Sequence, residues 1–136
     1  MKITKFVFAL KWSEDDQVYN IHGLWPEEKI GVVKEPTFEE KLVLDDKELL
    51  KQLKKNWNSD IHKGNDDKEI LEADLKFWNH EWNKHGRISG YDQKQYFQLA
   101  LDLYEKYKSQ TPVKKSGHQV YFYLDKDYNQ IKKIIK

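Results

Sequence analysis

The order of strand-like and helix-like segments constrains the fold of this chain more than any other feature. Residues 3–12 and 119–135 are rich in β-branched and aromatic residues, whereas residues 45–107 repeat apolar residues at helical spacing. Strand-forming ends around a helical middle are typical of an α+β domain, because the ends can pair into one sheet that the helices cover. The sequence therefore predicts a mostly antiparallel central sheet flanked by helices.

The boundaries of the expected elements follow from turn residues. The predicted strands cover residues 3–12, 17–21, 119–124 and 130–135, and the predicted helices cover residues 45–57, 69–84 and 91–107. Gly86 and Gly90 separate the last two helices, and residues 27–36 are expected to form a loop. The length of 136 residues, without repeats or linkers, predicts one domain over residues 1–136.

Composition limits the kinds of site that the chain can carry. Its 24 basic and 23 acidic residues give a formal net charge of +1, so polyanion binding requires a local patch. The absence of cysteine excludes disulfides and thiolate ligands and suits a reducing compartment. The apolar run over residues 6–10 is too short for a signal peptide, and no segment approaches a membrane span. We expect a cytoplasmic or otherwise intracellular protein without a membrane partner.

Four titratable residues lie together near the end of the second predicted helix. They are His80, Glu81, Lys84 and His85. Because each residue of an α-helix advances by about 100°, the four span about 140° and share one face, beside Trp78 and Trp82. The two tryptophans are expected to pack in the core. The four polar residues either form an ordinary solvated face with ion pairs or belong to a site.

A zinc site is a competing interpretation of this segment. His80-Glu81 followed by His85 is similar to the His-Glu-x-x-His pattern of zinc proteases. Histidines in that pattern lie four residues apart on one face, whereas a spacing of five separates them by about 140° around the helix. The chain also has no cysteine and offers no obvious third ligand. The sequence therefore predicts neither a metal nor another cofactor.

Two histidines and a lysine suit the cleavage of RNA without a metal. RNA supplies its own nucleophile, the 2'-hydroxyl group, and one imidazole can accept its proton while another protonates the departing 5'-oxygen. His22 is the candidate partner for the helix histidines. Gly23 permits close backbone approach, Trp25 offers a stacking face and Pro26 is expected to stiffen a turn. Taken alone, His22 would favour a structural role, and its pairing with the helix histidines reverses that preference.

These residues lie in two segments that resemble the ribonuclease T2 family. His22-Gly-Leu-Trp-Pro26 resembles its first active-site segment, and Phe77-Trp-Asn-His-Glu-Trp-Asn-Lys-His-Gly86 resembles its second. Residues 8–12, 96–107 and 120–127 resemble the first strand, a later helix and the closing strand of the family. The resemblance thus covers most of the chain and implies a ribonuclease T2-like fold.

The resemblance implies an endoribonuclease that cleaves single-stranded RNA through a 2',3'-cyclic phosphate. The implied catalytic residues are His22, His80, Glu81, Lys84 and His85. His85 would be the base toward the 2'-hydroxyl group and His22 the acid. His80 would contact the phosphate, while Glu81 and Lys84 would stabilise the phosphorane. The expected partner is single-stranded RNA and not DNA, and the expected state is a monomer.

Base recognition is the less determined part of the resemblance. Trp25 matches a base-stacking position and Phe77 matches a position that lines the second base pocket, although packing is an alternative role for both. Glu27 stands where an aspartate often reads the first base, and Lys11 stands where a glutamine is common. The base preference is therefore not carried over.

The chain also departs from the family in its cysteines and in its length. Arg87-Ile88 stands where Thr-Cys is common, and Tyr123 replaces a cysteine of the closing strand. Each lost disulfide removes about 2 to 4 kcal/mol, which the aromatic core would have to offset. Residues 109–117 stand where a longer region usually lies, so part of the substrate groove is expected to be missing.

A catalytically silent RNA-binding or interaction module on the same fold is the main alternative. Such a module would usually have lost an acid or base histidine. The chain retains both His22 and His85. The sequence therefore favours the enzyme.

Overall fold

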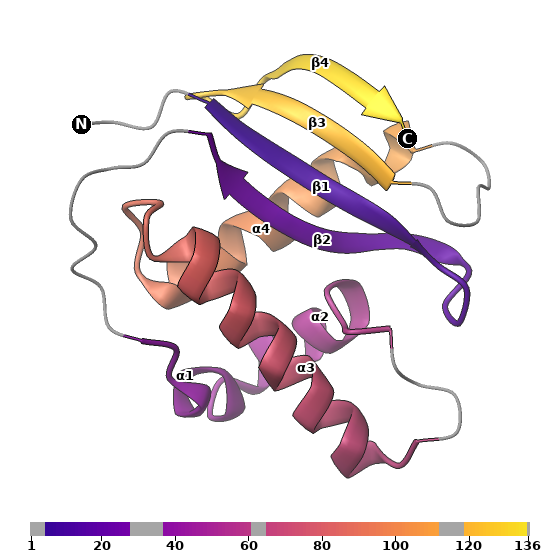
Figure 1. Ribbon diagram of the computed structural model, residues 1–136, viewed down its shortest axis with the longest axis vertical. Helices are drawn as coiled ribbons and strands as arrows, with labels where there is room; N and C mark the ends of the chain where they lie inside the picture. The colour runs from indigo at the N-terminus through magenta and orange to yellow at the C-terminus, as the bar shows by residue number, and fades with distance from the viewer. Residues whose placement is uncertain (1–4, 28–36, 61–64, 112–118, 136) are drawn as a thin grey trace.

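A computed structural model describes residues 5–27, 37–60, 65–111 and 119–135. Its four strands form one antiparallel sheet in the order β2-β1-β3-β4. The strands are β1 (Lys5–Ser13), β2 (Val18–Pro26), β3 (Gln119–Asp125) and β4 (Gln130–Ile135). In Figure 1, α1, α2 and α3 lie below the β2 edge of this sheet, and α4 crosses behind it. The predicted α+β architecture is confirmed.

The helices have defined bounds in the middle of the chain. They are α1 (Glu40–Leu44), α2 (Lys47–Asn56), α3 (Asp67–Glu81) and α4 (Gln93–Tyr107), with a π-helical turn, η1, over Trp82–Gly86 and a short 3-10 turn, η2, over Lys108–Gln110. No helix among the described residues is long and apolar enough to cross a membrane.

The core lies between one face of the sheet and α4. Alternate residues of β1 and β3 point to this side in register, so that Phe8 pairs with Phe122 and Leu10 pairs with Val120. From α4, the Tyr107 ring packs 5.0 Å from the Phe122 ring. The period of two along the strands thus sends alternate side chains to the opposite face of the sheet.

A second cluster of aromatic residues joins the helices to one another. Its fully buried members are Trp57, Trp78, Trp82, Tyr96 and Phe97. The predicted packing of Trp78 and Trp82 in the core is therefore confirmed. In a chain without cysteine, these rings provide much of the apolar burial that holds the helices together.

Side-chain caps fix where the helices begin. Asp66 accepts a hydrogen bond from the Glu69 amide at the start of α3. Asp46 does the same for α2, which lies within the helix predicted over residues 45–57. Helix α1 was not predicted, because its five residues are too few for a periodic pattern.

Two other boundaries differ from the prediction in ways that affect the site. Strand β2 continues to Pro26, so the turn expected there is wrong; pairing with β1 extends the strand beyond its local propensity. The helix predicted over residues 69–84 changes at Glu81 into the π-helical turn η1, whose defining bond runs from the Arg87 amide to the Trp82 carbonyl at 2.8 Å. Most of the loops predicted over residues 27–36 and 109–117 lie outside the described residues.

Candidate active site

A β-bulge presents His22 from the edge strand β2. Ala9 of β1 pairs with Gly23, and Leu10 pairs with Ile21, so His22 is the extra residue between two paired positions. A bulge of this kind re-aims a side chain relative to the regular strand. The His22 side chain therefore does not follow the regular alternation of side chains between the two faces of β2. The periodicity of the sequence does not predict this bulge.

Strand β3 supplies a partner for the His22 imidazole. His22 Nδ1 lies 3.1 Å from Gln119 Oε1, which also accepts a hydrogen bond of 2.6 Å from the Tyr121 hydroxyl group. Because an amide oxygen only accepts, His22 Nδ1 carries the hydrogen and Nε2 is left for chemistry. The sequence analysis missed Gln119 and Tyr121 as site residues, since nothing in the local sequence links them to His22.

The π-helical turn η1 brings His85 to the same region. The turn packs against β2, and the His85 ring lies 5.3 Å from the Trp25 ring. Gly86 makes this turn compact, because a Cβ atom there would lie 2.2 Å from the Trp82 ring. His85 and Lys84 therefore extend from a widened, π-helical turn rather than from the regular helix that the sequence predicted.

Trp25 connects the two histidines and the carboxyl group. Its ring lies 5.1 Å from the His22 ring and 5.3 Å from the His85 ring. Its indole Nε1 donates a hydrogen bond of 3.0 Å to Glu81 Oε1. Residues predicted from separate segments are thus brought together around one half-buried indole.

The absence of a side chain at Gly23 leaves room for the hydrogen bond between Trp25 and Glu81. A Cβ atom at residue 23 would lie 2.1 Å from Glu81 Oε1 and 2.1 Å from Trp25 Nε1. Real Cβ atoms do not approach other atoms so closely, so any larger residue would displace the hydrogen-bonded pair. The close approach that the sequence analysis expected at Gly23 is therefore made by the Glu81 and Trp25 side chains.

The four titratable residues of the second segment differ in exposure, which straight-helix geometry did not predict. The Glu81 residue is 2% exposed, whereas the His80 side chain is 63% exposed and Lys84 is exposed. His80 Nε2 lies 3.8 Å from Glu81 Oε2. Glu81 belongs to the interior of the site, while His80 and Lys84 face its open side.

Burial changes the protonation of Glu81. It raises the pKa of the carboxyl group to about 7, although the hydrogen bond from Trp25 and the charges of Lys84 and Lys11 oppose this rise. The carboxyl group is therefore close to half protonated at neutral pH. A group in this state can either donate or accept a hydrogen bond.

Burial also lowers the basicity of both histidines. It lowers the pKa of His85 to about 4, and the positive charges of Lys84, His80 and His22 act in the same direction. The pKa of His22 is lowered mainly by burial, against the hydrogen bond with Gln119. Both imidazoles are thus neutral at pH 7 in the free protein.

Phe77 and Lys11 form another side of the site. The Phe77 ring lies 6.4 Å from the His22 ring, and the Lys11 ammonium lies 4.5 Å from the Phe77 ring centre. Burial lowers the pKa of Lys11, and the charges of Asp60, Glu81 and Asp74 partly restore it. Lys11 therefore places a half-buried cation beside the predicted base-binding ring.

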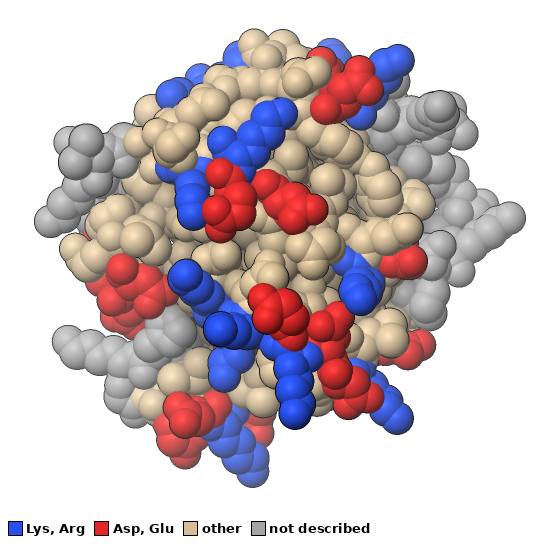
Figure 2. All heavy atoms as spheres, turned by 180° about the vertical axis from the view of Figure 1, so that it is seen from behind, with Lys and Arg blue, Asp and Glu red and all other residues tan. Residues whose placement is uncertain are grey.

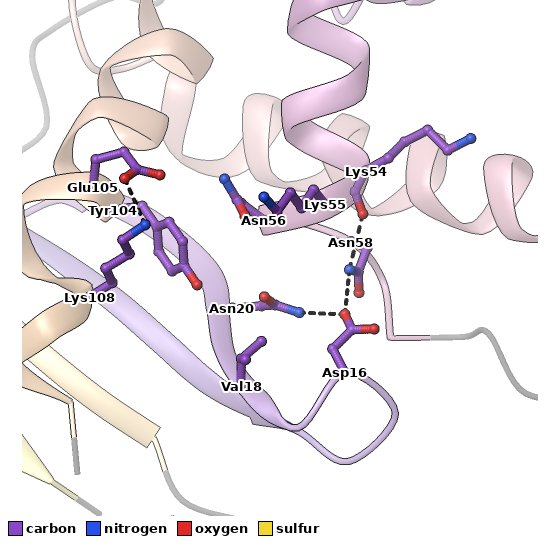
Figure 3. Close-up of a pocket in the computed structure, with 10 residues that line it drawn as sticks. All are labelled: Asp16, Val18, Asn20, Lys54, Lys55, Asn56, Asn58, Tyr104, Glu105 and Lys108. Carbon is purple, nitrogen blue, oxygen red and sulfur yellow. Dashed lines mark hydrogen bonds and ion pairs between the residues drawn. The ribbon is translucent and has the colours of Figure 1, made fainter. Parts of the chain in front are cut away.

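A separate hollow among the described residues lies away from the predicted site residues. A hollow of about 470 Å³ between β2, α2 and α4 contains none of them, and its Asn20 and Asn58 amides donate to Asp16 (Figure 3). On the face behind the sheet, basic and acidic side chains are intermixed (Figure 2). No group of three or more histidine, aspartate or glutamate side chains within the described ranges could hold a metal ion.

The chain is similar in sequence to known ribonucleases. A sequence model of the Ribonuclease T2 family matches residues 4–136. Over 94 residues, the chain is 40% identical to "Intracellular ribonuclease LX" of Solanum lycopersicum, a match that covers 67% of this chain. The chain spans only 36% of the length of that relative.

Solved structures show the same fold. Human ribonuclease T2 superposes with a TM-score of 0.67 at 22% identity, over 95% of this chain and 89% of that chain. A mutant of ribonuclease MC1 from bitter gourd seeds, in complex with 5'-GMP, superposes with a TM-score of 0.56 at 25% identity, over 77% of this chain and 59% of that chain. The ribonuclease T2-like fold expected from the sequence is confirmed.

Proposed function

Because the chain belongs to the ribonuclease T2 family, we propose that it is an endoribonuclease that cleaves single-stranded RNA by metal-independent transphosphorylation. The observation that supports this most directly is that the imidazoles of His22 and His85 lie 5.1 Å and 5.3 Å from one indole, that of Trp25. Two imidazoles that flank one side chain are the groups that a reaction with an internal nucleophile requires.

In the first step, His85 accepts the proton of the 2'-hydroxyl group while the 2'-oxygen attacks phosphorus. The bond from phosphorus to the 5'-oxygen breaks, and His22 Nε2 donates a proton to that oxygen. Gln119 holds the Nδ1–H group of His22, so the acid is the protonated imidazolium form of His22 and the proton transferred is the one on Nε2. The products are a 2',3'-cyclic phosphate and a 5'-hydroxyl end, and water later opens the cycle to a 3'-phosphate.

The remaining polar residues stabilise the phosphorane. Lys84 and His80 lie on the open side of the site, where they can contact the phosphate oxygens. Glu81 lies beneath them and, in its protonated form, can donate a hydrogen bond to an oxygen that gains negative charge. These groups act most strongly on the transition state, because its charge exceeds that of the substrate.

Two aromatic rings are placed to hold the bases on either side of the scissile phosphate. Trp25 is half-buried next to His85, and Phe77 is half-buried next to His22. Since His85 acts on the nucleotide with the reacting 2'-hydroxyl group, we assign the first base to Trp25 and the second base to Phe77. The 5'-GMP complex of ribonuclease MC1 supports a nucleotide ligand for this fold.

The partner, state and location of the protein follow the same reasoning. DNA lacks the 2'-hydroxyl nucleophile, so we propose that it is not a substrate. We propose a monomer of one domain in an intracellular compartment. The absence of cysteine and the name of the tomato relative support that compartment.

We expect the purified protein to degrade single-stranded RNA in excess EDTA and to leave 2',3'-cyclic phosphate ends. The reaction needs no metal, since the nucleophile, the acid and the base are all present in the RNA and the protein. Cleavage is measured on a labelled oligoribonucleotide, and the ends are identified by mass spectrometry. The matched control is the oligodeoxyribonucleotide of the same sequence, which should remain intact. Loss of cleavage in EDTA, or equal cleavage of the DNA, would contradict the mechanism.

The pH profile of kcat/KM is expected to be bell-shaped with its maximum on the acidic side of neutrality. Protonation of His85 should reduce kcat/KM as the pH falls through about 4. Deprotonation of His22 should reduce it as the pH rises through a pKa that lies below 6.5. The profile is measured under conditions where the substrate concentration is far below KM.

Lys84→Gln tests the electrostatic origin of this profile. Removing its positive charge should raise the pKa of both histidines and move both limbs to higher pH. Lys76→Gln, an exposed site on α3 that contributes to neither shift, should leave the profile unchanged. A wild-type maximum above pH 7 would be incompatible with the assigned protonation states.

A further inference from the structure

The strand register extends the active-site face of the sheet toward β4. Val7 of β1 pairs with Trp25 of β2 on one side and with Tyr123 of β3 on the other, and Tyr123 pairs with Lys132 of β4. Residues directly opposite one another in antiparallel strands point to the same face. Trp25, Val7, Tyr123 and Lys132 therefore form one row across all four strands.

An aromatic surface runs along this face from the proposed active site. The Tyr121 ring lies 6.1 Å from the Trp25 ring, and Tyr121 and Tyr123 are two residues apart on β3, so both point to the same side. Val7 and Ala9 of β1 lie between Trp25 and the tyrosines and are buried. Their side chains are smaller than the aromatic rings on either side of them. The surface is thus continuous with the residues around His22 and His85.

A cation stands above the far end of this surface. Lys132 Nζ lies 4.8 Å from the centre of the Tyr123 ring, and Lys132 is exposed while Tyr123 is half-buried. In Figure 1, no described helix crosses in front of β3 or β4, and α4 packs behind them. An open sheet face with an aromatic ring and a lysine is the combination that binds a base by stacking and its phosphate by charge.

We propose that Tyr123 and Lys132 form a further nucleotide-binding subsite, which holds an RNA nucleotide on the 5' side of the two nucleotides flanking the cleaved bond. This inference rests on the proposed ribonuclease function. Neighbouring strands lie about 4.8 Å apart, so Tyr123 stands about 10 Å from Trp25 across the strands, whereas Phe77 lies beside Lys11, four residues along β1 from the Val7 that pairs with Trp25. Because Trp25 holds the first base and Phe77 the second, a chain that leaves Trp25 across the sheet, and not along β1 toward Phe77, runs toward its 5' end.

Two substrates that differ only on the 5' side test this subsite. One is a ribodinucleoside monophosphate, and the other is a pentanucleotide that adds three deoxynucleotides 5' to the same two nucleotides. Of the two ribonucleotides, only the first has a phosphodiester next to its 2'-hydroxyl group, since the second is the 3' end, so both substrates are cut at one bond only. The wild-type protein should cleave the pentanucleotide with the higher kcat/KM.

Tyr123→Ala and Lys132→Ala should each lower kcat/KM for the pentanucleotide by about fivefold or more, and leave that for the dinucleotide unchanged. Tyr123→Phe keeps the stacking ring and should behave as the wild type. Lys133→Ala is the matched control, because Lys133 is on the same strand and pairs with core residue Phe122 on the opposite face. Lys132→Ala should also weaken the dependence of pentanucleotide cleavage on salt.

Several results would overturn the subsite. They are equal kcat/KM values of the wild-type protein for the two substrates, equal losses on both substrates in the variants, or an effect of Lys133→Ala as large as that of Lys132→Ala. Because Lys132 is exposed, Lys132→Ala keeps the test valid even if Tyr123→Ala fails to fold.

If the wild-type protein cuts neither substrate, the proposed function fails, and binding of the labelled pentanucleotide then tests the subsite. Weaker binding by Lys132→Ala than by Lys133→Ala supports the subsite, and equal binding refutes it.

Discussion

His85→Ala and His22→Ala are each expected to lower kcat on single-stranded RNA by a factor of about 10² to 10⁴. His85 is neutral at neutral pH because burial lowers its pKa to about 4, so it can accept a proton from the 2'-hydroxyl group. Gln119 lies 3.1 Å from His22 Nδ1, which leaves Nε2 for the proposed transfer of a proton to the leaving group. Turnover is measured with saturating oligoribonucleotide, and folding is checked by circular dichroism and thermal unfolding.

A sulfur-substituted substrate separates the acid from the base. If the departing 5'-oxygen is replaced by sulfur, the leaving group needs no proton, so His22→Ala should recover much of its lost rate. His85→Ala should remain slow, because the 2'-hydroxyl group still needs a base. Recovery in His85→Ala instead would exchange the two roles.

A control in the same turn guards against an indirect effect on the fold. Asn83 is exposed in η1 and its side-chain amide donates a hydrogen bond to exposed Asn79, so Asn83→Ala should keep near wild-type turnover. Wild-type turnover in either histidine variant would remove that histidine from the mechanism. A comparable loss in Asn83→Ala would indicate that the turn itself, and not the imidazole, is being tested.

Gly23→Ala is expected to lower both the stability and the activity of the protein. The new Cβ atom would lie 2.1 Å from both Glu81 Oε1 and Trp25 Nε1, and Glu81 is buried and has little room to move. Such overpacking typically lowers the free energy of unfolding by about 1 to 3 kcal/mol. Activity should fall as well, because the 3.0 Å bond that holds Trp25 beside the histidines is broken. Urea denaturation and the cleavage assay measure the two effects.

A double variant identifies the clash as the cause. In Gly23→Ala/Glu81→Ala the carboxyl group is absent, so the loss of stability should be smaller than the sum of the two single losses. Additive losses would show that Glu81 is not the group displaced. A Gly23→Ala protein with wild-type stability and turnover would contradict the packing described around Trp25.

Local sequence features predicted the fold well where they acted over short distances. Strands β3 and β4 follow alternating or β-rich segments, and α4 follows an apolar stripe behind the Asp92 cap. The predictions failed where pairing or packing decided a boundary. Pairing with β1 extends β2 to Pro26, and the packing of Trp82 over Gly86 turns the end of α3 into a π-helical turn.

The sequence by itself determined which residues are candidates for the chemistry: both histidine segments, with their lysine and glutamate, stand out by residue types, spacing and resemblance to the ribonuclease T2 family. Tertiary structure alone decided which contacts they make and how deeply they are buried. Trp25 and Glu81 are 56 positions apart in the sequence, and His22 and Gln119 are 97 positions apart, yet each pair is in contact. The burial that shifts the pKa values of Glu81 and His85 likewise arises only in the folded chain. Local spacing has no means of specifying such contacts, because hydrogen-bond geometry and desolvation depend on which surfaces meet after the chain has folded.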